Sequence, residues 1–171
     1  HLDGTGRVWV GCVGGVAVWR NGRLDFVGAP VPQATFVHML DNPAGGLFIA
    51  SADRGLWQLD EADHWLPIAP EALGNQGVYA LHRVADSLWL ATSGRGLARW
   101  RAGELKFVPI AGVEAAASVL SLTDDARGNL WLGSRRGLFR LPLASANAAA
   151  DGLKESSEAE VFGPEEGLTS L

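Results

Sequence analysis

Three arginines stand at the same point of a recurring turn and are the clearest candidates for binding chemistry. Arg54, Arg95 and Arg136 each precede a glycine that opens an apolar stretch, and Gly14 takes the corresponding place near the start of the chain. A guanidinium presents a planar fork of N–H donors that matches a carboxylate or a sulfate. One interpretation is a rim of these three side chains that binds an anionic ligand or partner. The repeat favours the structural interpretation, in which each arginine stacks on the tryptophan of a neighbouring repeat or pairs with a carboxylate such as Asp53.

Residues for catalysis or metal binding form no recognisable pattern. The four histidines show none of the spacings of a metal site, and the sequence has no G-x-S-x-G nucleophile elbow and no phosphate-binding loop. Asp124 and Asp125 are adjacent, so on a strand they point to opposite faces, and we expect them to bond their own turn backbone. Cys12, the only cysteine, is predicted to be a small buried strand residue. We predict no catalytic residue, no metal and no cofactor in this segment.

An internal repeat of about 40 residues places these candidates along the whole chain. The first aromatic residue of each repeat recurs at spacings of 39, 41 and 42, and the glycine of the turn at spacings of 40, 41 and 41. The aromatic positions are Trp9, Phe48, Trp89 and Trp131, and the glycine positions are Gly15, Gly55, Gly96 and Gly137.

Within each repeat the apolar pattern has a period of two, which is typical of β-strands. In "NLWLGS", Leu130 and Leu132 point to one face and Trp131 to the other. The Gly, Ser and Arg residues that follow suit a tight hairpin turn. Hairpins are predicted near residues 6–20, 45–60, 86–101 and 128–142, with one strand after each and another before the last three. Four short antiparallel strands per repeat predict an all-β fold, a β-propeller of four-stranded blades, as one region over residues 1–171.

The repeat resembles the two-component regulator propeller family, whose consensus is approximately D-x-x-G-x-L-W-x-G-T-x-x-G-L. "DDARGNLWLGSRRGL" matches it almost throughout and "ADSLWLATSGRGL" matches it closely, whereas Phe48 replaces the tryptophan and Val16 the leucine in the other two repeats. The tail "VFGPEEGLTSL" looks like the signature between blades in the same family. The resemblance implies a periplasmic propeller in a receptor that continues into an immunoglobulin-like domain, a membrane helix, and a histidine kinase or diguanylate cyclase.

The two ends of the sequence are parts of one repeat. When "SL" at the end is read on into "HLDGTGRVW" at the start, it aligns with "SLTDDARGNLW". Four whole repeats leave two possibilities: a four-bladed ring, or an arc of a larger ring whose other blades come from elsewhere or from another copy. The family resemblance favours the arc, since it implies larger rings. Self-association that completes a propeller is therefore a predicted interaction.

The last repeat carries an insertion over residues 142–160, where alanine and charged residues suit a short helix and a loop. The favoured interpretation is a tolerated surface insertion, and the alternative is an element that docks over a sheet edge. His38 and His82 occupy similar places in two first strands, which line the central channel of a propeller, and the other repeats have Thr123 and Leu2 there. Structural or solvated histidines are the favoured interpretation of this pair.

The amino-acid composition argues against some classes of partner. Hydrophobic residues make up 47% and charged residues 19% of the 171 residues, as in globular proteins, and the net charge of -5 argues against a nucleic-acid partner. No run of 18 apolar residues and no export signal is present in the segment, so we expect it not to be membrane-inserted itself. The leading prediction, which the family resemblance implies, is a periplasmic sensor module of a bacterial signalling receptor that binds a small molecule or an oligosaccharide and is not itself an enzyme. The alternatives are a protein-interaction scaffold, or a propeller polysaccharide lyase or glycosidase.

Overall fold

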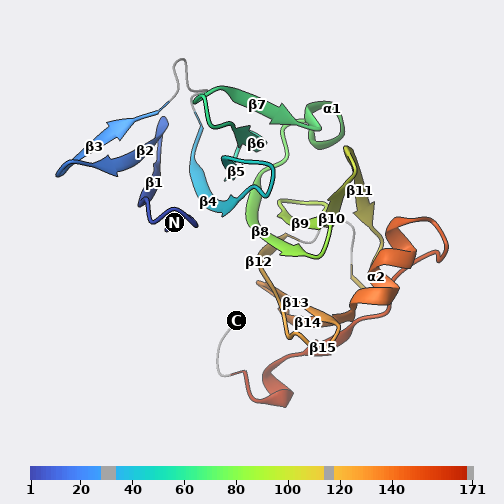
Figure 1. The fold of residues 1–171 in the computed structure, drawn as a ribbon. Helices are drawn as coiled ribbons and strands as arrows, with labels where there is room; N and C mark the ends of the chain where they lie inside the picture. Colours follow the sequence, from blue (N-terminus) through green and yellow to red (C-terminus); the bar gives the residue numbers. More distant parts are fainter. Residues whose placement is uncertain (28–33, 114–117, 169–171) are drawn as a thin grey trace. The chain divides into compact units, whose positions relative to one another are not determined.

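A computed structural model describes residues 1–27, 34–113 and 118–168 of the chain (Figure 1). Within these residues the strands form four antiparallel sheets, one of three strands and three of four. Each sheet is a simple meander, in which consecutive strands pair with one another. The predicted fold class, an all-β propeller built of such blades, is confirmed. The chain divides into two compact units, His1–Val78 and Tyr79–Leu171.

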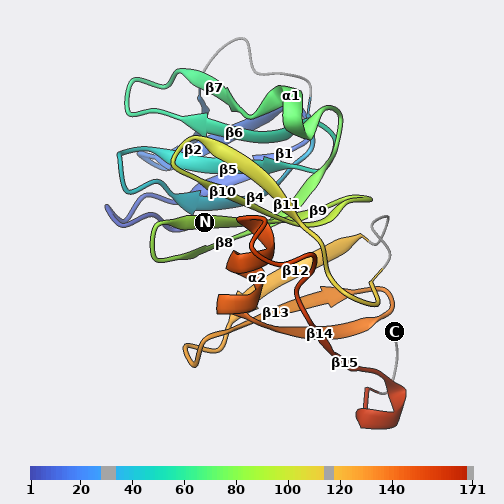
Figure 2. The ribbon, with the colours of Figure 1, turned by 90° about the vertical axis from the view of Figure 1, so that its right-hand side faces the viewer.

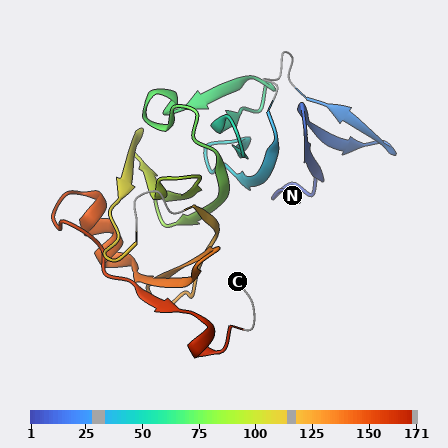
Figure 3. The same cartoon turned by 180° about the vertical axis from the view of Figure 1, so that it is seen from behind.

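The first unit holds blades 1 and 2. Blade 1 consists of β1 (Trp9–Cys12), β2 (Gly15–Arg20) and β3 (Arg23–Phe26). Blade 2 consists of β4 (Phe36–Asp41), β5 (Leu47–Ser51), β6 (Gly55–Leu59) and β7 (Trp65–Ile68), followed by the short helix α1 (Pro70–Leu73; Figure 3). In blade 1 the place of a first strand is taken by the residues around Leu2, which forms a single antiparallel bridge to Val8. The predicted closing residues Ser170 and Leu171 lie outside the described residues.

The second unit holds blades 3 and 4. Blade 3 consists of β8 (Val78–Val84), β9 (Ser87–Thr92), β10 (Gly96–Arg101) and β11 (Glu104–Val108). Blade 4 consists of β12 (Val119–Asp124), β13 (Asn129–Ser134), β14 (Gly137–Pro142) and β15 (Glu160–Phe162). Helix α2 (Leu143–Ala150) lies between β14 and β15 of blade 4, and the 3₁₀ turn η1 (Pro164–Glu166) follows β15. That all four blades form one propeller region over residues 1–171 stays a prediction.

The period-two pattern gives every blade two faces. On one face lies the first aromatic residue of the repeat, and we call this the Trp face; the leucine or valine before that residue lies on the other, the Leu face. In blade 1 the register pairs Trp9 with Val18 and Gly11 with Val16, so these residues share the Trp face. In blade 4 it pairs Leu130 with Leu141 and Leu132 with Phe139, which share the Leu face.

Each unit is held together by a Trp face packed on a Leu face. Trp9, Val16 and Val18 of blade 1 form one buried cluster with Leu47, Ile49 and Leu59 of blade 2. Trp89, Ala91 and Leu97 of blade 3 form another with Leu130, Leu132 and Phe139 of blade 4. Burying these side chains removes apolar surface from water, which is the main stabilising contribution. The sheets approach closely at Gly11, where an added Cβ would lie 2.9 Å from the Met39 Cε atom.

Two of the strand-centre tryptophans, Trp9 and Trp89, lie in the core between the blades of their unit, whereas Trp131 packs within its own blade. Trp9 is 3% exposed and Trp89 fully buried, but Trp131 is only half-buried. Its ring stacks on Phe162 of its own blade at a centroid distance of 5.3 Å, and the Arg140 guanidinium lies 5.7 Å from its centroid. The repeat position determines the face on which a tryptophan lies and not what covers that face.

The insertion in blade 4 is part of the core of its unit, which agrees with the alternative interpretation, an element that docks over a sheet edge, and not with the favoured one, a surface insertion. Helix α2 contacts β11 and β14 (Figure 2), and Ala146, Ala149 and Ala150 are buried in the same cluster as Trp89. After the helix, Ser157 forms a parallel bridge to Ile110, next to the outer strand of blade 3. The insertion thus binds the two blades of the second unit to each other.

Candidate functional site

The turns that carry the candidate arginines share one local design. A hydroxyl residue ends the second strand and a glycine with positive φ begins the third, at 74° for Gly55, 70° for Gly96 and 130° for Gly137. The hydroxyl bonds the turn backbone: Ser134 Oγ accepts from the Arg136 N–H, and Thr92 Oγ1 donates to the Gly96 carbonyl over 2.8 Å. These bonds fix the backbone at each arginine, as expected for side chains of serine and threonine in turns.

Cys12 takes the hydroxyl position in blade 1, with its Sγ 3.3 Å from the Gly15 carbonyl oxygen. The prediction that Cys12 is buried is wrong, because its side chain is exposed on the Leu face of blade 1.

Arg95 is positioned by an aromatic side chain of its own blade. Its guanidinium carbon lies 3.4 Å from the centroid of the Phe107 ring, a close cation–π contact. The two residues border a hollow of about 250 Å³, whose floor is formed by Val108, Pro109, Ile110 and Val113. The N–H donors of a guanidinium lie at the edge of its plane, so stacking occupies the face of the group and not its edge. The site combines a fixed cation with an apolar floor.

Arg54 borders the corresponding hollow of blade 2. This hollow of about 260 Å³ lies between the start of β6 and the end of β7, with Trp57, Pro67 and Leu73 among its lining residues. Asp53 stands beside Arg54, and its pKa is lowered, first by the hydrogen bond from Ser51, next by the Thr35 N–H, and also by the charge of Arg54. An anionic carboxylate next to Arg54 makes this hollow less positive than the one at Arg95.

Arg136 occupies the same turn of blade 4 and is exposed. Arg95 and Arg136 belong to the second unit and Arg54 to the first. Of the two interpretations, the stacking of Arg95 supports the structural one in part, but on Phe107 of its own blade rather than on a neighbouring tryptophan. A common rim of the three arginines stays a prediction.

The first strands bring histidines and aspartates together in a way that the spacing did not indicate. His82 on β8 lies 2.7 Å from Asp124 at the end of β12, between Nε2 and Oδ1. In the first unit, His1 lies 2.6 Å from Asp41 at the end of β4, between the same atoms. Each pair joins the first strand of one blade to that of the next.

The predicted equivalence of His38 with Thr123 and Leu2 is wrong. Thr123 pairs with Trp131, while His38 pairs with Ala50, two residues away from the partner of Phe48. The residue whose backbone bonds Trp9 is His1, so His1 rather than Leu2 takes the place of Thr123 in blade 1. His1 and His38 both border a hollow of about 270 Å³ formed with Gly11 and Phe36.

Aspartates in the turn that precedes the repeat tryptophan bond the turn backbone, as predicted for Asp125. Asp125 accepts hydrogen bonds from Arg127 N–H and from Asn129 N–H and Nδ2, and these bonds lower its pKa. Asp3 forms the same kind of turn in blade 1. Burial by itself would raise the pKa of Asp3, but hydrogen bonds from Trp9, Thr5 and Arg7 outweigh burial and hold it well below its ordinary value.

Among the residues that the structure describes, no three His, Cys, Asp or Glu side chains gather as a metal site needs. Tyr79 and His82 are three residues apart on β8 and therefore point to opposite faces of the strand, so they do not form an acid–base pair. Over the same residues, no helix has the length and apolar character to cross a membrane.

No protein-family model and no curated protein matches the chain. Solved structures do match its fold. A chain described as the extracellular domain of the hybrid two-component system BT3049 from B. thetaiotaomicron aligns with 95% of this chain at a TM-score of 0.75 and 16% identity. The corresponding domain of BT4673 from the same organism aligns with 78% at a TM-score of 0.62 and 19% identity. Virginiamycin B lyase from Staphylococcus aureus aligns with 95% at a TM-score of 0.68 and 13% identity.

The chain spans only part of each of these proteins, 24% of the BT3049 domain, 19% of the BT4673 domain and 53% of the lyase. At such identities the likeness establishes the fold, and fold alone does not fix function. The matches agree with the resemblance of the repeat to the two-component regulator propeller. The chain is thus a set of four β-propeller blades, with a fold found in receptor extracellular domains and in a lyase.

Proposed function

We propose that the chain is a ligand-binding module in the extracytoplasmic, periplasmic part of a bacterial signalling receptor. The observation that carries the proposal is the hollow at Arg95, where a stacked guanidinium borders an apolar floor. A concave apolar site with one or two fixed polar groups is the usual form of a small-molecule site. Support also comes from the fold of the two-component extracellular domains that the chain resembles.

The ligand class follows from the lining. A carboxylate or sulfate fits the edge of the guanidinium, and the apolar face of a sugar ring fits the floor formed by Pro109, Ile110 and Val113. We therefore propose an acidic small molecule or an oligosaccharide with acidic groups. In the receptor, binding would shift a two-state equilibrium by no more than the difference in affinity of the ligand for the two states.

The test is calorimetric titration with two probes, a short oligogalacturonate and a sulfated disaccharide. Arg95→Ala should weaken binding roughly tenfold or more, because it removes a charge-assisted hydrogen bond. Arg127→Ala is the matched control, since Arg127 is also an exposed turn arginine but follows β12. It should leave the affinity unchanged. Tight binding that Arg95→Ala does not alter would mean that the ligand binds at another site. Failure of both probes to bind would favour an interaction scaffold.

A lyase is the second candidate, because virginiamycin B lyase shares the fold. The opposite orientations of Tyr79 and His82 argue against it, as does the engagement of Asp124 by His82 and by the Ala126 N–H. An unsaturated product formed from the oligogalacturonate, detected by its ultraviolet absorbance, would favour the lyase instead.

A further inference from the structure

The floor of the hollow at Arg95 is held by the insertion of blade 4. Beyond the end of β11, the Pro109 carbonyl accepts a hydrogen bond of 2.8 Å from the Ser157 N–H, and the Ala111 N–H donates one of 2.8 Å to the Ser157 carbonyl. These two bonds flank the parallel bridge between Ile110 and Ser157, and Ser157 is fully buried. A segment outside the blade 3 sheet thus fixes the backbone of Pro109 and Ile110, two of the residues that line the hollow.

The opposite side of the hollow belongs to the sheet of blade 3. Phe107 pairs with Ala98 in the register of β10 and β11, and Arg95 stacks on the Phe107 ring. Strand pairing therefore fixes the guanidinium, whereas the position of the floor follows a separate segment of the chain. The width of the hollow depends on where the insertion docks.

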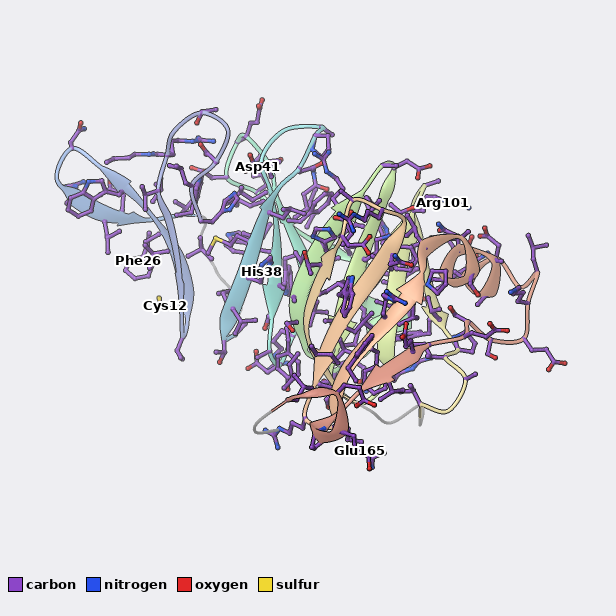
Figure 4. All side chains as sticks on the ribbon, turned by 90° about the horizontal axis from the view of Figure 1, so that it is seen from below. Cys12, Phe26, His38, Asp41, Arg101 and Glu165 are labelled. Carbon is purple, nitrogen blue, oxygen red and sulfur yellow. The ribbon has the colours of Figure 1, made fainter. Side chains whose placement is uncertain are left out.

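A buried ion pair fixes the docking position of the insertion. Arg99, 3% exposed on β10, forms an ion pair with Asp151 at the end of α2 and donates to Asn147 Oδ1 over 2.6 Å. Arg101, labelled in Figure 4, also donates to Asp151, over 3.1 Å. Loss of this one carboxylate charge would leave a buried guanidinium without its countercharge. Because Asp151 precedes Ser157 by only six residues, the anchor and the hold on the floor belong to one short segment.

Apolar packing joins the same two elements. Ile110 and Val113, which line the hollow, pack against the buried cluster that contains Ala146, Ala149 and Ala150 of α2. Movement of α2 away from the sheet would expose apolar surface of that cluster, which costs free energy. The floor and the helix are therefore expected to open together.

We propose that the insertion is the positioning element of the ligand site, with Asp151 as its anchor and Ser157 holding the floor against the stacked Arg95. The proposal rests on the ligand-binding function proposed above and adds the element that responds to an occupied hollow. A ligand that binds only when the floor is in place stabilises the docked insertion by the same factor by which docking favours the ligand. Binding at the hollow is thereby transmitted to α2.

Amide hydrogen exchange in the ligand-free protein tests the link between anchor and floor. In Asp151→Asn, the Ala111 amide should exchange roughly tenfold faster, although the two residues are 40 apart in the sequence. Glu155→Gln is the matched control, since Glu155 is an exposed acid of the same insertion, and it should leave the Ala111 rate unchanged. Faster exchange in α2 with an unaltered Ala111 rate in Asp151→Asn would overturn the proposal, because the floor would then be held without the anchor.

Exchange in the wild-type protein with a bound probe tests the link to the ligand and needs no change in the anchor. With the oligogalacturonate or the sulfated disaccharide at about ten times its Kd, the Ala111 and α2 amides should exchange roughly tenfold more slowly. Amides of the turn around Asp125, between β12 and β13, should keep their rates. Arg95→Ala at the same probe concentration should abolish the protection of α2.

Protection of Ala111 without protection of α2 would overturn the proposal, since the floor would then respond to the ligand independently of the helix. Failure of both probes to bind would count against the ligand-binding function instead. The Ala111 exchange rate in Asp151→Asn would in that case still decide whether the insertion positions the floor.

Discussion

The indole Nε1 of Trp9 donates a hydrogen bond of 2.7 Å to Oδ2 of Asp3, a carboxylate that is 7% exposed. Blade 4 repeats the relationship between Trp131 and Asp125 over 3.3 Å. In blade 3 the turn between β8 and β9 consists of Ala85 and Asp86 alone. Among the described residues, the buried Nε1 of Trp89 finds no acceptor. In blades 1 and 4, where the turn is longer, the aspartate therefore accepts hydrogen bonds both from the turn backbone and from the tryptophan indole.

Trp9→Phe should destabilise the protein more than Trp89→Phe. Both substitutions remove a similar ring volume from a core, but only Trp9→Phe takes a donor away from a buried carboxylate. We expect the free energies of unfolding to differ by about 1–2 kcal/mol, the cost of an unmet charged acceptor. Urea unfolding followed by far-ultraviolet circular dichroism measures both values. Equal losses would mean that the Asp3 bond contributes nothing net.

Stability should decrease in acid, and Asp3 should account for part of the decrease. The pKa of Asp3 is lower in the folded chain than in the unfolded one, so the unfolded state binds its proton first as the pH drops. The contribution is complete above an ordinary aspartate pKa of about 4 and is lost as the pH falls through the lower folded value. Unfolding midpoints between neutral and acidic pH should fall less steeply in Asp3→Asn than in the wild type. Parallel slopes would contradict the role of Asp3.

The anchor of α2 gives a third prediction. Arg99, 3% exposed, donates to Asn147 Oδ1 over 2.6 Å and forms an ion pair with Asp151, which also accepts from Arg101. Asp151→Asn should leave the buried guanidinium without its countercharge. Amide hydrogen exchange in α2 should then become roughly tenfold faster, while β5 and β6 in the other unit stay unchanged. The control is Asp25→Asn, because the partner Arg23 is 77% exposed and such pairs contribute little.

The strands were predictable from the sequence because their signals are local. The period of two and the turn glycines predict the four hairpins, and the strands of each hairpin lie within the predicted ranges 6–20, 45–60, 86–101 and 128–142. Exposure was not predictable in the same way. Cys12 and Trp131 follow the repeat pattern of buried residues, yet Cys12 is exposed and Trp131 only half-buried, because the alternation along a strand determines the face on which a side chain lies and not what covers that face.

Contacts across the chain were harder still to predict from the sequence. Arg99 meets Asn147 and Asp151 only because the insertion folds back over β11, and nothing near Arg99 in the sequence signals it. The pairs His1–Asp41 and His82–Asp124 depend on strand register, which a one-residue difference in turn length changes. A search for carboxylates 40 to 42 residues after each histidine would have found both pairs.

The His82–Asp124 pair supports a last prediction about proton affinity. The pKa of Asp124 is lowered, first by the hydrogen bond from His82 and then by the Ala126 N–H. His82→Leu removes the larger of these contributions, so the Asp124 pKa should rise toward the ordinary aspartate value. Carboxyl ¹³C resonances followed against pH report it directly. The matched control is His64→Leu, because His64 pairs with Asp60 within one exposed turn; it should shift Asp60 upward and leave Asp124 unchanged. If Asp124 titrates identically in His82→Leu and in the wild type, the inter-blade contact does not persist in solution, and the first strands of blades 3 and 4 are held by packing alone.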